Sequence, residues 1–335
     1  MPAPRTLDIQ QLEDRRLLAL NPTGAEQELL QLINRFRTSP SAEFGRMFSS
    51  VSPLRARDAD VQSQVDYFGT NGTVLKQEFD ALDPSPPLAW NDAINTYAKQ
   101  HNTSMTNASP PHAFHSNTAQ RRQALIDAGV NLRIVAGEKI QSENVFGAGT
   151  SPQQILAAYL VEWGPGPNGM LGHRRHREAL LNPDFEQMGQ ALTTFTGGTL
   201  GPIVNTQIMA NIEDPPTMAV GALFEDTNAS GWYENGEGIG GATIRFVGAS
   251  GTYTTQSLSA GGYQIELPSG SYQVTASGGG MKHAVVSSVT IGSTNAWLNL
   301  EYDPASPPPD RLEPNNSTGA ASSLTGEAQT VSGLS

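Results

Sequence analysis

The spacing of apolar residues changes abruptly at the proline pair Asp214-Pro-Pro216. Before this point apolar residues recur at helical intervals, as at Leu29, Ile33 and Phe36. After it they alternate in short runs separated by glycine-rich turns, as in residues 242–246. A chain of 335 residues is long enough for two modest domains. The change of period therefore predicts a domain boundary at this linker, with different fold classes on its two sides.

Helix start and stop signals divide the first domain, predicted over residues 24–213. Thr23 and Glu26 form a capping box, and Pro40 closes the helix that follows. SPSAEFGRMF can form a second helix. Further helices are expected at 90–106, from Thr118 to Gly129, from Ser151 to Gly164 and from His173 to Leu181. Strands are expected at Leu132–Ala136, 188–196 and 201–210. Helices around a small antiparallel sheet make this an α+β domain.

The second domain, predicted over residues 217–302, has about seven short strands in some 85 residues. Its alternating runs include Ala242/Ile244/Phe246, Tyr263/Ile265/Leu267, Tyr272/Val274/Ala276 and Trp297–Leu300. Short alternating strands with turn signals between them are typical of an all-β, Ig-like sandwich.

Charge and cysteine content exclude several classes of function. The chain has 20 basic against 32 acidic residues, a net charge of −12, which is the wrong sign for neutralising the phosphates of a nucleic acid. It has no cysteine, so disulfides, thiolate metal sites and a cysteine nucleophile are excluded. No run approaches the ~20 apolar residues of a membrane span. Nucleic-acid binding and membrane spanning are therefore not expected.

Residues 112–183 gather four of the six histidines with two acids, Glu143 and Glu162. Neutral imidazoles beside carboxylates can bind a divalent cation or transfer protons. The spacing places Glu162 on one helix face with Tyr159, and it places His173 and His176 on one helix surface. The alternative is a set of buried polar groups that bond to one another and hold the loops. For the residues together, a polar cleft is favoured.

Four segments occur in an order that resembles a known family. They are ELLQLINRFRTSP, PPLAWNDAINTYAKQHNTSM, SEN at 142–144 and HREALLNPDFEQMG. The first domain thereby resembles the CAP superfamily, which comprises cysteine-rich secretory proteins, antigen 5 and pathogenesis-related 1 proteins, in its bacterial SCP-like form. The resemblance implies an α-β-α sandwich with an open cleft lined by two histidines and two glutamates.

Carried onto this sequence, the resemblance implies the cleft residues His115, Glu143, Glu162 and His176. His112 is the alternative to His115, because two histidines stand where the family has one, and His173 is the extra histidine beside His176. Ser142 replaces the glycine of the family's GEN, and Tyr159 replaces the tryptophan of its W-x-x-E.

The expected function of this cleft is to bind a divalent metal such as zinc, or a small-molecule, lipid or protein ligand. No nucleophile elbow G-x-S-x-G and no zinc helix H-E-x-x-H is present in the sequence. Binding therefore ranks above catalysis, and the protein is expected to bind a ligand rather than to act as an enzyme. The alternative is a peptidase-like hydrolase that uses His115 or His176 as base and Glu143 or Glu162 to orient it.

A second candidate site precedes the strand at residue 242. Oxygen donors occupy positions 1, 3, 5, 7, 9 and 12 of an EF-hand-like spacing, with glycine at position 6, and they belong to Asp226, Asn228, Ser230, Trp232 (through its carbonyl), Glu234 and Glu237. Clustered hard oxygens favour Ca²⁺. The surrounding segment resembles the SdrD-B-like repeats of bacterial surface adhesins, which implies calcium as a stabiliser of a sandwich spacer. A solvated acidic turn is the alternative.

Both ends of the chain suggest export. LEDRRLLA, within an expected leader at residues 1–22, resembles the N-terminal tag of many exported bacterial proteins. Residues 303–335 form a proline-rich linker, and EPNNSTGAASSL within it resembles the start of a pre-peptidase C-terminal-type domain. The expected location is secreted or cell-surface. A surface adhesion module without catalysis is the remaining alternative.

Overall fold

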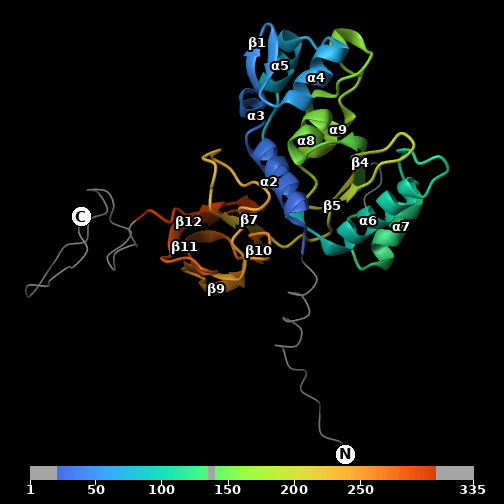
Figure 1. The fold of residues 1–335 in the computed structure, drawn as a ribbon. Coiled ribbons are helices and arrows are strands. Elements are labelled where there is room, and N and C mark those ends of the chain that lie inside the picture. Colours follow the sequence, from blue (N-terminus) through green and yellow to red (C-terminus); the bar gives the residue numbers. More distant parts are fainter. Residues whose placement is uncertain (1–20, 135–139, 307–335) are drawn as a thin grey trace, which may run out of the picture.

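The computed structural model describes residues 21–134 and 140–306 (Figure 1). Most of the expected leader, part of the expected strand Leu132–Ala136 and the expected additional module after residue 306 lie outside these described residues.

Eight α-helices are described in the first part of the chain. They are α2 (Gly24–Thr38), α3 (Pro40–Met47), α4 (Ala59–Phe68), α5 (Gly72–Asp80), α6 (Asp92–Thr106), α7 (Thr118–Asp127), α8 (Pro152–Val161) and α9 (Arg175–Leu181). The predicted capping box is present, because Thr23 and Glu26 each bond to the other's backbone N–H. Gly129 has a φ of +86°, a conformation that glycine adopts without strain just after α7.

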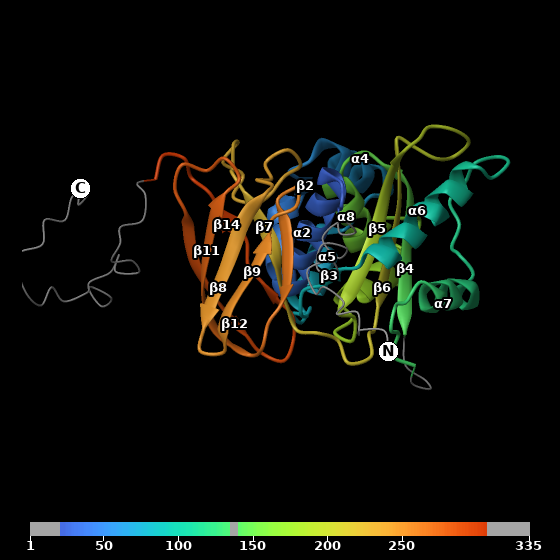
Figure 2. The same cartoon turned by 90° about the horizontal axis from the view of Figure 1, so that it is seen from below.

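A four-stranded sheet lies between two helical layers (Figure 2). Its order is β3 (Ala89–Trp90), β5 (Gln187–Thr194), β6 (Ile203–Ala210) and β4 (Gln141–Gly149). Helices α6 and α7 pack on one face around Ile94 and Leu125, whereas α2, α8 and α9 pack on the other around Ile33 and Ile155. A separate hairpin of β1 (Phe48–Val51) and β2 (Leu54–Ala56) joins α3 to α4. The α+β class and the α-β-α layering are confirmed.

Two sequence expectations were wrong in detail. Trp90 belongs to β3 and not to the helix that follows, because Asn91 caps α6 by accepting a hydrogen bond from Ile94 N–H. Leu132 makes only an isolated bridge to Ile212, so the described part of the expected strand at Leu132–Ala136 forms no regular ladder.

The second part of the chain is an all-β sandwich, as predicted. Its strands are β7 (Met218–Phe224), β8 (Ala242–Gly248), β9 (Gly251–Gln256), β10 (Gly262–Glu266), β11 (Gly270–Gly278), β12 (Val285–Ile291), β13 (Ala296–Trp297) and β14 (Leu300–Glu301). One sheet has the order β10-β7-β13, with β14 also on β7, and the other has the order β12-β11-β8-β9. Leu223, Phe246 and Val274 are fully buried in its core.

The sandwich docks on α2 and β3 (Figure 2). A set of amide side chains makes this contact. Gln31 Oε1 accepts from Trp297 Nε1 at 2.8 Å. Gln264 bonds to both main-chain groups of Trp90, at 3.0 and 3.1 Å. Asn295 Nδ2 donates to the carbonyls of Pro87 and Glu186 at 3.0 Å. Because each amide satisfies a buried polar group on the other side, this contact is specific as well as extensive.

A buried arginine links α2 to the end of α9. Arg37 is 0% exposed and donates to the carbonyl oxygens of Pro86, Leu180, Asn182 and Phe185. Burial lowers the pKa of Arg37 to about 9. The side chain still carries its charge at neutral pH, and four carbonyl dipoles replace the water that it has lost. The position of α9, and of the histidine that it carries, depends on this contact.

Glu28 is the buried acid of the interface. It is 4% exposed, it accepts from the Asn235 N–H at 3.1 Å, and Gln153 donates to its other oxygen. Burial raises the pKa of Glu28 to about 7, and the charges of Glu234 and Glu237 add to this effect against the two hydrogen bonds. The folded protein therefore binds a proton at Glu28 over a pH range in which the unfolded chain has released it.

We expect Glu28→Gln to increase the free energy of unfolding at pH 8 by about 1–3 kcal/mol and to leave it nearly unchanged at pH 4. The protonated Glu28 contributes its full stabilisation below the unfolded pKa of 4.5, and this contribution to the free energy of unfolding is lost as the pH rises through the folded pKa of about 7. Urea unfolding between pH 4 and pH 8 in EDTA measures this. Glu178→Gln, at an exposed position, is the control. A Glu28→Gln protein less stable than wild type at pH 8 would contradict the expectation.

Candidate functional site

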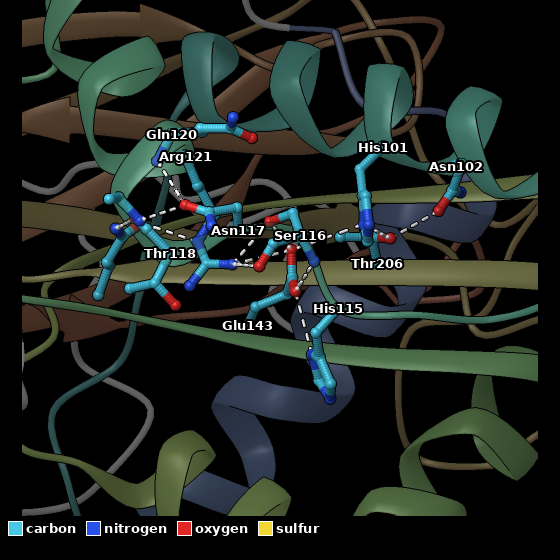
Figure 3. A network of polar contacts seen from close by, with 12 residues as sticks. His101, Asn102, His115, Ser116, Asn117, Thr118, Gln120, Arg121, Glu143 and Thr206 are labelled. Carbon is cyan, nitrogen blue, oxygen red and sulfur yellow. Dashed lines mark hydrogen bonds and ion pairs between the residues drawn. The ribbon is translucent and has the colours of Figure 1, made fainter.

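The first acid of the site, Glu143, lies on β4 and is saturated with donors (Figure 3). Its Oε2 accepts from His115 Nδ1 at 3.0 Å and from the Ser116 N–H at 2.8 Å. Its Oε1 accepts from Ser116 Oγ at 2.6 Å and lies 3.1 Å from Arg121 Nη1. The Glu143 side chain is only 2% exposed. Strand β4 and the start of α7 thus hold one carboxylate in a fixed orientation.

This environment keeps Glu143 ionised. Burial by itself would raise its pKa, but the hydrogen bonds from His115 and Ser116, together with the charge of Arg121, lower the pKa below its usual value. A buried carboxylate with several donors is stable only in its charged form. Glu143 therefore presents a permanent negative charge to the imidazoles beside it.

The structure distinguishes the two candidate histidines of this segment. His115 contacts Glu143, and its side chain is 60% exposed. His112 instead has its Nδ1 2.8 Å from the carbonyl of Pro110 and its ring 5.3 Å from the ring of Phe114. With Nδ1 directed to the acid, His115 presents its remaining ring edge toward solvent, as a ligand-binding or proton-transferring imidazole requires.

A third histidine, which sequence reasoning did not nominate, lies on the inner side of Glu143. His101 on α6 is 5% exposed, and its Nδ1 is 3.5 Å from Glu143 Oε1 and 3.1 Å from Thr206 Oγ1. Burial lowers the pKa of His101, against the raising effect of Glu143. The available signal was its place on the apolar face of the helix, where an imidazole needs a buried partner. Arg121 and Ser116 were missed as well, because only the fold brings them to Glu143.

The second acid, Glu162, is buried at the end of α8. It is 1% exposed, and its backbone is left-handed with a φ of +52°. Its Oε1 accepts from the N–H groups of His176 at 2.8 Å and Arg177 at 3.2 Å. Its Oε2 is buried without a hydrogen-bond partner, 3.6 Å from His176 Nδ1 and 3.7 Å from His173 Nδ1. The two carboxylates of the site therefore differ, since one is saturated and the other has an unused oxygen.

Two expectations about this part of the site were wrong. Glu162 is not on a helix face with Tyr159, because the helix has already ended in the left-handed cap that turns the acid inward. His173 is not on the helix of His176, because α9 begins at Arg175. Both histidines nevertheless approach the same oxygen of Glu162, since the loop before α9 folds back over that acid.

The two acid–histidine groups adjoin through one buried amide. Asn144, next to Glu143 on β4, donates to the His176 carbonyl and to Gln207 Oε1, both at 3.3 Å. The structure thus gives two groups, His115 on Glu143 and His173 with His176 on Glu162. Within residues 21–134 and 140–306, no three or more His, Asp or Glu side chains stand close enough to form an assembled metal site.

The candidate calcium loop folds around its own two end carboxylates. Asp226 accepts from the N–H groups of Ser230 at 3.0 Å and Gly231 at 2.8 Å. Glu237 accepts from the N–H groups of Thr227 at 3.0 Å and Glu234 at 2.9 Å.

Five other positions of this loop also have defined conformations or partners. Gly231, at position 6, has a φ of +82°, which explains the glycine there. Asn228 Nδ2 donates to Glu234 Oε2, and Ser230 Oγ donates to the Trp232 carbonyl. The loop joins β7 to β8, and calcium binding there stays a prediction.

Comparison with known proteins bears on both parts of the chain. The model described as the cysteine-rich secretory protein family (CAP) matches residues 30–208. The model described as a carboxypeptidase regulatory-like domain matches residues 232–301. No significant match is found among curated proteins.

Double-mutant cycles are expected to distinguish the partner of Glu143 that stabilises the fold from the partner that is exposed for binding. We expect a coupling energy above about 1.5 kcal/mol between buried Arg121 and Glu143, and at most about 1 kcal/mol between exposed His115 and Glu143. Urea unfolding of the single and double alanine variants gives both values. An equal or larger coupling for His115 would show that this imidazole serves the fold.

Proposed function

Because the chain belongs to the cysteine-rich secretory protein (CAP) family and carries a β-sandwich after that domain, we propose that it is an exported binding protein whose Glu162–His173–His176 group takes up a divalent cation. The sandwich is a docked companion of the CAP domain. Export is supported by the family's secretory members and by the tag-like LEDRRLLA. In the described residues, no helix is long and apolar enough to cross a membrane.

The unpartnered oxygen of Glu162 carries this proposal. A buried carboxylate oxygen without a donor costs about 1–3 kcal/mol or more, so a site that keeps one is expected to satisfy it by another group. The neighbouring imidazole nitrogens are too distant for hydrogen bonds, at 3.6 and 3.7 Å. A cation between the three side chains would satisfy the oxygen and both nitrogens together.

The residue types suit zinc, and the three side chains lie near one another without standing at coordinating distances. Zn²⁺ is bound by imidazole nitrogens and carboxylate oxygens at roughly 2.0–2.2 Å, which separates neighbouring ligands by about 3.4 Å in a tetrahedral site. The Glu162–His173 and Glu162–His176 separations exceed this by a few tenths of an ångström. Small imidazole rotations would therefore be needed. His176 would hold the ion from α9, His173 from the preceding loop, and Glu162 from the interior.

Glu143 and His115 are assigned a different role in the same proposal. Glu143 has its acceptor sites filled, and it holds His115 with Nδ1 directed inward and most of the ring exposed. An imidazole fixed in this way can donate to or accept from a polar group of a ligand. Small-molecule, lipid and protein ligands all present such groups, and the chemistry of His115 does not choose among them.

A peptidase-like hydrolase is the second candidate. The hydrogen bond between Glu143 and His115 favours it, because a carboxylate-oriented imidazole is also the arrangement of a general base. In the described part of the chain, no serine or threonine hydroxyl bonds to His115, His173 or His176. An activated water would have to be the nucleophile, so binding ranks first. A purely adhesive role for the sandwich ranks below both.

Calcium binding by the Asp226–Glu237 loop is the second part of the proposal. The Asp226 and Glu237 carboxylates both turn into the loop, where they accept backbone N–H groups. Calcium takes bidentate and monodentate carboxylates together with backbone carbonyls, and the Trp232 carbonyl supplies one here. The ion would stiffen the connection between β7 and β8, close to the interface with α2.

We expect one Zn²⁺ to bind per chain, with Glu162→Gln and His176→Ala each lowering the affinity by at least about tenfold. Equilibrium dialysis with metal analysis measures stoichiometry and affinity together. His173→Ala is expected to have a similar effect because its nitrogen lies as close to Glu162 Oε2.

His115→Ala is the matched control, since it removes an imidazole on the other acid. An equal loss of zinc affinity in His115→Ala would show that the two groups share one ion and would contradict the assignment to Glu162. Wild-type protein without zinc affinity would overturn the metal proposal.

Calcium is expected to raise the unfolding temperature of wild-type protein but not that of Asp226→Asn or Glu237→Gln. Saturation at one hundred times Kd corresponds to about 2.7 kcal/mol of stabilisation. The calcium-induced shifts are compared, not the baselines, because Glu237 also accepts two N–H groups of the loop. Glu301→Gln, an exposed substitution elsewhere in the sandwich, should shift as wild type does. Absence of a shift in every protein would remove calcium from the proposal.

A further inference from the structure

A cavity of about 400 Å³ lies where the CAP helices meet the sandwich, away from both acid–histidine groups. Its volume is in the range of small-molecule sites, which often form at domain interfaces. Apolar side chains from four helices line it, namely Leu32, Met47, Val61, Leu156 and Ala157. The sandwich contributes Trp232 and Glu234. Neither part of the chain forms this cavity alone.

One polar group in the cavity wall is buried without a partner. Arg35 on α2 is 9% exposed and lines the cavity. Its Nε and Nη2 donate to Glu43 at 3.0 and 2.5 Å, whereas Nη1 is buried and has no hydrogen-bond partner. The guanidinium lies 4.6 Å from the ring centroid of Trp232. The stacking and the Glu43 pair fix the orientation of the guanidinium, so Nη1 is a positioned and unused donor.

The remaining charges of the cavity add further donors. Arg46 Nη1 lies 3.2 Å from Glu43, which is fully buried and shared between the two arginines. Arg57 lines the cavity and uses its Nε on the Gly45 carbonyl. The acid Asp58 accepts two N–H groups at the start of α4.

Glu234 is the other acid of the lining, and it accepts from Asn228 Nδ2. The carboxylates of the cavity are therefore engaged, while guanidinium N–H groups are left over.

We propose that this cavity binds a compact organic carboxylate, with the apolar body against Leu156 and Ala157 and with the carboxylate reaching Arg35 Nη1 once the side chains that cover this atom move aside. Guanidinium groups bind carboxylates through parallel, charge-assisted hydrogen bonds. A ligand of this kind satisfies the unused donor and fills the apolar volume at once. The site goes beyond the zinc proposal and uses none of the residues of the Glu162–His173–His176 group, although it shares Trp232 and Glu234 with the candidate calcium loop.

Calorimetric titration with 2-naphthoate and its neutral analogue 2-naphthamide, in EDTA, tests the proposal. We expect 2-naphthoate to bind with one-to-one stoichiometry and at least about tenfold more tightly than the amide, because only the acid makes a charge-assisted bond to Arg35. Equal affinity of the two probes, or binding of neither, would overturn the proposal. The chelator keeps this result independent of metal binding at Glu162.

Two variants locate the bound probe. Arg35→Lys keeps a positive charge beside Glu43 but removes the planar donor, and Ala157→Leu fills the cavity without changing a charge. Each variant should lower the affinity for 2-naphthoate at least about tenfold. Circular dichroism and the unfolding temperature are expected to show that at least one of the two variants is folded. His115→Ala should bind the probe as wild type does. Wild-type affinity in a folded Arg35→Lys or Ala157→Leu protein, or loss in His115→Ala, would place the probe elsewhere and refute the site.

Discussion

Helix α2 is nearly without a solvent face, and the rest of the structure depends on this constraint. Residues 26–37 are all buried. Its apolar side chains enter the core of the CAP domain, while Glu28 and Gln31 accept hydrogen bonds from Asn235 and Trp297 of the sandwich. Arg37 holds the end of α9, and Arg35 stands at the domain junction. The helix therefore joins core, site and interface. The expected description of the sandwich as a spacer understates a contact that buries this many polar groups.

The local rules of helix and turn formation carried most of the fold prediction. Thr23, Pro152 and Gly129 act through hydrogen bonds or dihedral preferences within a few residues. The local sequence is therefore sufficient to predict where these helices begin or end. The family motifs supplied the topology, which periodicity alone could not. The errors at Trp90 and His173 came from extending a helical period past a cap, where the backbone changes direction although the spacing still fits.

The candidate site was predictable in its residues but not in its chemistry. His115, Glu143, Glu162 and His176 came from the family resemblance, and the structure pairs them in two groups. What distinguishes the two acids is the count of donors around each, and those donors are contacts between distant segments, such as Arg121 and Ser116 on Glu143. His101 was hidden for the same reason. A histidine on an apolar helix face is ordinary until the strand opposite it contributes a carboxylate.

The left-handed backbone at Glu162 has an evolutionary consequence. A residue with a Cβ pays about 1–2 kcal/mol to adopt this conformation, and glycine or asparagine would adopt it with less strain. Substitutions selected only for thermal stability would therefore drift toward those residues and erase the acid. The fold keeps a glutamate at φ +52°, and its carboxylate accepts hydrogen bonds from the His176 and Arg177 N–H groups there. Sequences that keep the domain but carry glycine here would have kept the architecture while losing this half of the site.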